Sequence, residues 1–116
     1  PPSIDINVEF ATGSAKLTSE ARSALDQLGQ ALANPALAAY HFQLVGHTDT
    51  TGTPAANLAL SDARAKVVAQ YVESKFHIDP SRIDAYGVGE KDLLVPTGPD
   101  TSNQANRRVQ IINTGK

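Results

Sequence analysis

The chain has 116 residues, of which 41% are hydrophobic, and this predicts one domain (residues 1–116) with a single core that needs no metal or disulfide. Its formal net charge is −2 and its basic residues cluster only at Arg107-Arg108, which argues against nucleic acid as a partner. The absence of cysteine excludes a disulfide framework and a cysteine metal site. No apolar run approaches the roughly 20 residues that span a bilayer, so we predict no membrane insertion by this domain.

The first predicted element is a strand at the N-terminus. Polar residues at positions 5, 7 and 9 alternate with four apolar ones: Ile4, Ile6, Val8 and Phe10. This period of two predicts a strand over about residues 3–10 with one buried face. Small residues follow at 11–15, and we expect them to form a loop that presents backbone N–H groups.

A helix is predicted next, and either Thr18 or Ser19 can cap its first turn. One apolar stripe runs along it: Ala21, Leu25, Leu28 and Leu32. The stripe predicts a helix that continues to about Ala33 and ends before Asn34-Pro35. Gly29 costs this helix about 1 kcal/mol relative to Ala, which is tolerable if another element packs closely against it.

A second strand and a long second helix follow. After one short turn at 36–40, the apolar run Phe42-Gln43-Leu44-Val45 predicts a strand over about residues 41–47. Pro54 suits the first turn of a helix of about twenty residues. The predicted core-facing stripe of this helix consists of Leu60, Val67, Val68, Tyr71, Val72 and Phe76.

The C-terminal part of the chain is predicted to contain two strands and one long loop. A short third strand is expected over 82–86 and a fourth over 107–113. Residues 88–106 contain Gly and Pro without periodicity, and loops of this length are usually functional or mobile. The order β-α-β-α-β-β predicts an α+β fold, a single mixed four-stranded sheet with two main helices on one face.

Two opposite charges are predicted to flank one cleft. Asp49 lies where the second strand ends and a helix is about to begin, and Arg64 lies about two turns into that helix. Because a helix rises about 1.5 Å per residue, a long side chain at Arg64 can reach back toward the loop that carries Asp49. Asp49 can accept an ammonium group and Arg64 can hold a carboxylate through two parallel hydrogen bonds. We therefore infer a ligand that carries both groups on one carbon, as an amino acid does.

Simpler interpretations of the same residues remain open at this point. Asp49 could cap the following turn, and Arg64 could form a surface ion pair with Asp62 or Glu20. His47 and Asp49 lie on one face of an extended segment, but no third ligand has suitable spacing, so we predict no metal site and no other cofactor.

Several ordered motifs resemble those of the OmpA-like C-terminal domain family, and the resemblance covers almost the whole chain. The motifs are Gly46-His47-Thr48-Asp49 with Gly52, then Asn57, Leu60-Ser61 and Arg64-Ala65, then Gly87-x-Gly89-Glu90, and finally Asn106-Arg107-Arg108-Val109. The resemblance implies non-covalent binding of peptidoglycan in the periplasm of a diderm bacterium, through the stem peptide and chiefly its meso-diaminopimelate residue. Members of the family include outer-membrane porins, peptidoglycan-associated lipoproteins and flagellar stator subunits.

The resemblance also implies roles for single residues. It assigns the clasp on diaminopimelate to Asp49 and Arg64 and the ordering of the loop to Asn57. It places the loop after the first strand at Thr12 and Gly13, and it puts Arg107 near the pocket. The implied location is the periplasm, with the full-length protein tethered to the outer membrane, so that the domain anchors a parent protein or that membrane to the cell wall.

One departure from the family pattern concerns the residue after the first strand. Many members have an acidic residue directly after the Phe that ends this strand, whereas this chain has Ala11. Any contact made by that acid is lost, but the backbone N–H groups of Thr12 and Gly13 need no particular side chain. We expect the pocket to persist.

Two other classes of function are alternatives to wall binding: a peptidoglycan-cleaving enzyme and a protein-interaction module. A peptidoglycan-cleaving enzyme would need a metal centre, a cysteine nucleophile or paired carboxylates, and the sequence contains no persuasive version of these, so we predict that the domain is not an enzyme. A periplasmic protein-interaction module is the other alternative, with the loop at 88–106 meeting a protein partner.

Overall fold

The computed structural model describes residues 3–6, 8, 10, 11 and 13–116. The elements follow in the order β1 (Ser3–Ile6), α1 (Ser19–Leu32), β2 (His41–Gly46), α2 (Pro54–Phe76), β3 (Ile83–Gly87) and β4 (Val109–Gly115). Short 3-10 helices occur at Pro35–Leu37, Pro80–Arg82 and Gln104–Asn106.

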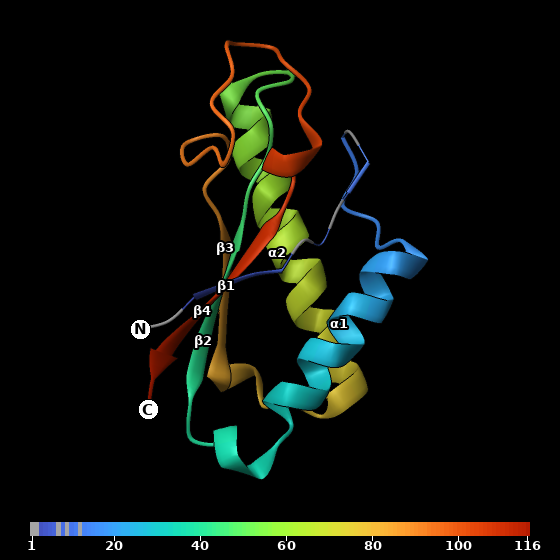
Figure 1. The fold of residues 1–116 in the computed structure, drawn as a ribbon, viewed down its shortest axis with the longest axis vertical. Helices are drawn as coiled ribbons and strands as arrows, with labels where there is room; N and C mark the ends of the chain where they lie inside the picture. Colours follow the sequence, from blue (N-terminus) through green and yellow to red (C-terminus); the bar gives the residue numbers. More distant parts are fainter. Residues whose placement is uncertain (1–2, 7, 9, 12) are drawn as a thin grey trace.

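The strands form one mixed sheet in the order β1-β4-β2-β3. β4 runs antiparallel to both β1 and β2, whereas β2 and β3 are parallel and are connected through α2. Both long helices lie on the same side of the sheet (Figure 1). The prediction of an α+β fold with two main helices and a mixed sheet is confirmed. No helix among the described residues combines the length and the apolar character that a bilayer crossing requires.

Helix α1 forms where the apolar stripe predicts it. The Thr18 side chain accepts a hydrogen bond from the backbone N–H of Ala21 at 3.0 Å and so caps the first turn. The residues of the predicted stripe are all buried: Ala21, Leu25, Leu28 and Leu32. Gly29 is buried against Phe76 of α2, and a Cβ there would lie 2.1 Å from the Phe76 ring. The close helix contact explains why glycine is used at this position.

The first strand is shorter than predicted. β1 ends at Ile6, which pairs with Val109, the first residue of β4. Because β4 begins only at Val109, Val8 and Phe10 have no strand beside them and lie outside any strand, although both are buried. Residues 7 and 9 of the predicted strand lie outside the described residues. The placement of Arg107 at the start of the fourth strand is also wrong, because β4 begins only at Val109.

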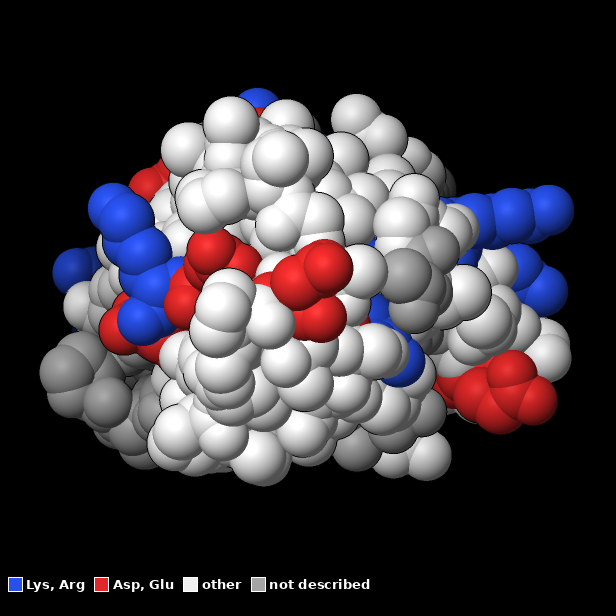
Figure 2. Space-filling view, turned by 90° about the horizontal axis from the view of Figure 1, so that it is seen from above, with Lys and Arg blue, Asp and Glu red and all other residues white. Residues whose placement is uncertain are grey.

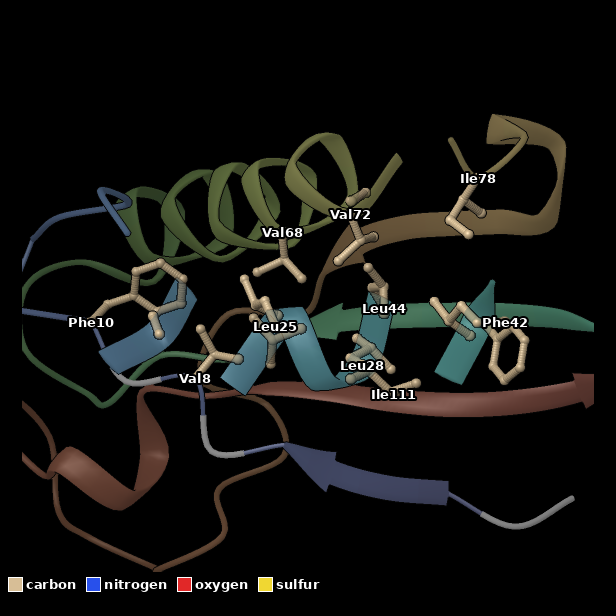
Figure 3. Close-up of a cluster of buried hydrophobic side chains, with 14 residues drawn as sticks. Val8, Phe10, Leu25, Leu28, Phe42, Leu44, Val68, Val72, Ile78 and Ile111 are labelled. Carbon is tan, nitrogen blue, oxygen red and sulfur yellow. The ribbon is translucent and has the colours of Figure 1, made fainter. Parts of the chain in front are cut away.

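The core lies between the helices and the sheet. Its labelled members in Figure 3 come from the N-terminal segment, α1, β2, α2, the segment after α2, and β4: Val8, Phe10, Leu25, Leu28, Phe42, Leu44, Val68, Val72, Ile78 and Ile111. Although Val8 and Phe10 have left the sheet, they close the core at the end next to the first half of α2.

The first half of α2 does not follow its predicted apolar stripe. Its buried residues include three polar ones, Asn57, Ser61 and Arg64, whereas Leu60 is only half-buried. The cause is what this half of the helix contacts. A Cβ on Gly46 would lie 2.0 Å from the backbone oxygen of Ser61, so the helix rests directly on the backbone at the end of β2. There it meets backbone N–H and C=O groups, which polar side chains can satisfy.

Candidate ligand-binding site

A cavity of about 350 Å³ opens at the end of the sheet where β2 gives way to α2. It is lined by Gly13, Asp49, Thr51, Gly52, Ala56, Asn57, Leu60, Arg64 and Arg107. The cavity thus brings together every predicted site residue that the structure describes. Thr12, which the sequence also assigned to the site, lies outside the described residues.

Arg64 extends from α2 into this cavity and is 1% exposed. Its Nε donates to the backbone oxygen of Ser14 at 2.9 Å, and its Nη2 donates to that of Ala11 at 3.0 Å. The guanidinium lies over the Phe10 ring, 5.0 Å from the centroid. Its Nη1 is buried and donates to none of the described residues. One donor group of a buried cation therefore has no hydrogen-bond partner among the described residues.

The surroundings of Arg64 make its charge costly. Burial and, to a lesser extent, the positive charge of Arg107 lower the pKa of Arg64 to about 10, against the opposing effect of the negative charge of Asp49. With a pKa of about 10 the side chain is still cationic at neutral pH. Both of its hydrogen-bonded partners are neutral carbonyl oxygens. A buried cation without a bonded anion gains much from an incoming carboxylate.

The alternative of a surface ion pair for Arg64 is wrong. Asp62 instead binds Lys66 at 2.6 Å and accepts a hydrogen bond from the backbone N–H of Gly87 at 3.2 Å. The carbonyl oxygens that hold Arg64 belong to Ala11 and Ser14, in the segment that precedes α1.

Asp49 is buried and its carboxylate is already engaged by three protein donors. Oδ1 accepts from the backbone N–H of Thr51 at 3.0 Å, and Oδ2 accepts from that of Asn103 at 3.2 Å and from Arg107 Nη1 at 2.5 Å. Burial raises the pKa of Asp49, but the hydrogen bonds from Arg107, Thr51 and Asn103 lower it by more, so the pKa lies below its ordinary value. The carboxylate is therefore ionised at neutral pH. Its bond to the backbone N–H of Thr51 also caps the following turn, which was the simpler interpretation of Asp49.

Arg107 makes contacts in the cavity that the sequence did not predict. Besides its ion pair with Asp49, its Nε donates to the backbone oxygen of Phe10 at 3.1 Å, and its guanidinium donates to the side chains of Ser102 and Gln104. The pairing of β2 with β4 carries the signal that could have identified it. Gly46 is the partner of Val109 in that ladder, so the residues after Gly46 and those before Val109 emerge at the same end of the sheet.

Asn57 holds the loop of Asp49 in place. Its Nδ2 donates to the backbone oxygen of Asp49 and to the carboxylate of Glu90, each at 3.3 Å. The side chain is 4% exposed. Asn57 thereby connects α2, the loop after β2 and the turn after β3 through one amide group.

The loop at 88–106 is hydrogen-bonded to the loop after β2, although it lacks sequence periodicity. Thr50 Oγ1 donates to the backbone oxygen of Gly98 at 2.7 Å and accepts from the N–H of Thr101 at 2.9 Å. The side-chain amide of Asn106 forms two hydrogen bonds with the Val95 backbone, both of 2.8 Å. Figure 1 shows this loop against the loop after β2 and the first turns of α2.

The charged residues that line the cavity do not cancel. Arg64 and Arg107 carry two positive charges and Asp49 carries one negative charge, which leaves one net positive charge. Figure 2 looks onto the end of the molecule that holds the loop at 88–106, and acidic side chains lie near the middle of that face between basic ones. The positive charge is therefore enclosed in the cavity and is not part of a broad basic surface.

The structure offers no arrangement for a metal in the part of the chain that it describes. No group of three or more His, Asp or Glu side chains among those residues is positioned to hold an ion. His47 is buried, and its Nε2 lies 3.4 Å from the side-chain oxygen of Gln110.

Comparison with known proteins gives a consistent result over most of the chain. A sequence model of the OmpA family matches residues 9–107. Outer membrane protein A of Serratia odorifera is 36% identical over 115 residues, an alignment that covers 90% of this chain and 47% of that protein. The chain thus spans about half the length of this relative.

Solved structures share the fold. The peptidoglycan-associated lipoprotein from Burkholderia pseudomallei is similar with a TM-score of 0.80 and 25% identity, covering 92% of this chain and 88% of that one. The cell wall anchor of the type VI secretion system (T6SS) from Pseudomonas aeruginosa is similar with a TM-score of 0.75 and 25% identity, covering 98% and 80%.

Proposed function

The chain belongs to the OmpA family, and on that premise we propose that it binds peptidoglycan non-covalently through the meso-diaminopimelate residue of the stem peptide. The observation that carries the proposal is the buried Arg64, whose Nη1 lacks a partner among the described residues while the side chain lines a cavity shared with Asp49. Two similar structures, a peptidoglycan-associated lipoprotein and a cell wall anchor, support the proposal.

The chemistry of diaminopimelate suits this cavity. The free end of its side chain carries an ammonium and a carboxylate on one carbon. Arg64 Nη1 would donate to the carboxylate, and the remaining acceptor position on the Asp49 carboxylate would accept from the ammonium. Gly13 lines the same cavity with a backbone φ of 70°, a conformation that glycine adopts readily.

The biological role that we propose is attachment in the periplasm. The domain would anchor its parent protein, or the outer membrane to which that protein is tethered, to the cell wall. No chemical step is involved in this role. One cavity with one charged clasp binds weakly, but the wall repeats its stem peptides many times, so several tethered copies would hold by effective concentration.

Co-sedimentation with purified sacculi tests the proposal. The wild-type domain should pellet with diaminopimelate-type sacculi, and Arg64→Gln should remain in the supernatant. Lys66→Gln is the matched control, because it removes one positive charge from an exposed position of the same helix and should pellet like wild type. Thermal unfolding of each variant verifies that it is folded. Release of soluble wall fragments by the wild-type domain would favour the alternative of a cleaving enzyme.

A second candidate function is a periplasmic protein-interaction module that uses the loop at 88–106. The observation in its favour is the exposure of large apolar side chains there: Leu94 is 54% and Val95 39% exposed. Leu58 on α2 is 49% exposed. Retention on sacculi that is unchanged by both Asp49→Ala and Arg64→Ala would favour this candidate over stem-peptide binding.

A further inference from the structure

We infer that the ligand's carboxylate, and not its ammonium, carries recognition at this cavity, so that the site accepts a side chain that ends in a carboxylate without an adjacent amine. The inference rests on the proposed function and narrows the chemical class of the ligand. It follows from an asymmetry between Asp49 and Arg64 that the sequence does not reveal.

Asp49 is largely committed to the protein. A carboxylate has about four acceptor positions, and three donors already occupy it: the backbone N–H groups of Thr51 and Asn103, and Arg107 Nη1. The Arg107 contact also supplies the positive charge that an ammonium would bring. An incoming ammonium therefore adds a fourth hydrogen bond to a carboxylate that is already neutralised.

Arg64 is in the opposite situation. Its two hydrogen bonds go to the neutral carbonyl oxygens of Ala11 and Ser14, and its Nη1 has no partner among the described residues. The residue that Nη2 contacts, Ala11, has no carboxylate that could neutralise the guanidinium. A ligand carboxylate would be the first anion to bond to Arg64.

The net charge of the residues that line the cavity also favours a carboxylate as the recognised group. The residues lining the cavity carry one net positive charge, from Arg64 and Arg107 against Asp49. A lone carboxylate brings this set to neutrality. A zwitterionic end group is neutral itself and leaves the positive charge in place, so the ammonium brings no overall compensation to the buried set.

Three soluble stem tripeptides that differ only in their third residue test this inference by calorimetric titration of the folded domain. The third residue is meso-diaminopimelate, 2-aminopimelate, which lacks the distal amine, or lysine, which lacks the distal carboxylate. We expect loss of the amine to weaken binding by less than threefold and loss of the carboxylate to weaken it by tenfold or more. The inference is overturned if loss of the amine costs as much affinity as loss of the carboxylate, or more.

Asp49→Asn supplies an independent readout. If the ligand amine contributes little through Asp49, the affinity ratio between the diaminopimelate and 2-aminopimelate peptides should stay within twofold of its wild-type value. If this affinity ratio is large in the wild-type domain and falls to one in Asp49→Asn, then Asp49 binds the ligand amine and the inference is wrong. If the diaminopimelate peptide does not bind at all, the proposed function itself fails, an outcome distinct from a changed order among three peptides that bind.

Discussion

Asp49 and Arg107 lie 58 residues apart in the sequence and form a buried ion pair, with Arg107 Nη1 2.5 Å from Asp49 Oδ2. The pair connects the loop after β2 to the residues that precede β4, and the same guanidinium reaches the backbone of Phe10. Three segments that are distant in the sequence meet at this one side chain. The cavity wall therefore depends on a contact that stabilises the fold as well as the site.

Arg107→Ala should be strongly destabilising, because it leaves the Asp49 carboxylate buried without its cationic partner. Removal of one member of a buried pair costs about 3 to 5 kcal/mol. Urea denaturation of the variant and of wild type measures the change in the free energy of unfolding. Lys66→Ala is the control, since it breaks an exposed pair with Asp62 and should cost less than about 1 kcal/mol. Similar losses for the two variants would contradict the assignment.

Acid should destabilise the domain through Asp49. Because the folded-state pKa of Asp49 is below its ordinary value of 3.8, ionised Asp49 stabilises the fold above that pH, and this stabilisation is lost as the pH falls through the folded pKa. Asp49→Asn should be less stable than wild type at pH 7, and the difference should shrink as the pH falls below about 4. Denaturation curves at a series of pH values measure it, and a difference that stays constant down to pH 2 would refute this role.

Gly46→Ala should disturb both the fold and the site. The new Cβ would lie 2.0 Å from the backbone oxygen of Ser61, so the first half of α2 must move away from β2 and take Asn57 and Arg64 with it. We expect a loss of about 3 kcal/mol or more, at the upper end for overpacking. Gly98→Ala is the control because no atom lies within 4 Å of its added Cβ, and its stability should stay within about 0.5 kcal/mol of wild type.

Asn57→Ala should loosen the loop of Asp49 without removing a charge. The variant leaves the backbone oxygen of Asp49 and the Glu90 carboxylate without their shared donor, which we expect to cost about 1 to 3 kcal/mol. Amide hydrogen exchange should be faster at Thr51 and Gly52 than in wild type. Unchanged exchange at these two amides would contradict the role of Asn57 in ordering the loop.

The sequence predicted the elements whose pattern is local. The stripe of α1 follows from helical spacing alone, and the positions of Asp49 and Arg64 follow from a strand end and a helix register. The end of β1 could not be predicted in this way, because alternation continues to Phe10 while the partner strand begins only at Val109. The residue at which β1 ends therefore depends on where the neighbouring strand, β4, begins.

The burial of Asn57, Ser61 and Arg64 could not be predicted either, because the buried face of a helix is predicted from its apolar residues. The first half of α2 contacts backbone groups at glycine positions and a polar cavity, where these polar side chains find partners. The engagement of Asp49 by Arg107 required the pairing of β2 with β4, which no local pattern contains.

Titration of the folded domain with diaminopimelate-type and lysine-type stem peptides tests the central claim most directly. Arg64 would lose its carboxylate partner in the lysine-type peptide, and a hydrogen bond to a charged group is worth about 1.5 to 3 kcal/mol, so binding should weaken roughly tenfold to a hundredfold. The same domain with Arg64→Gln should bind both peptides weakly and without preference. Equal affinity of the wild-type domain for the two peptides would contradict the role of Arg64 as the carboxylate-binding residue.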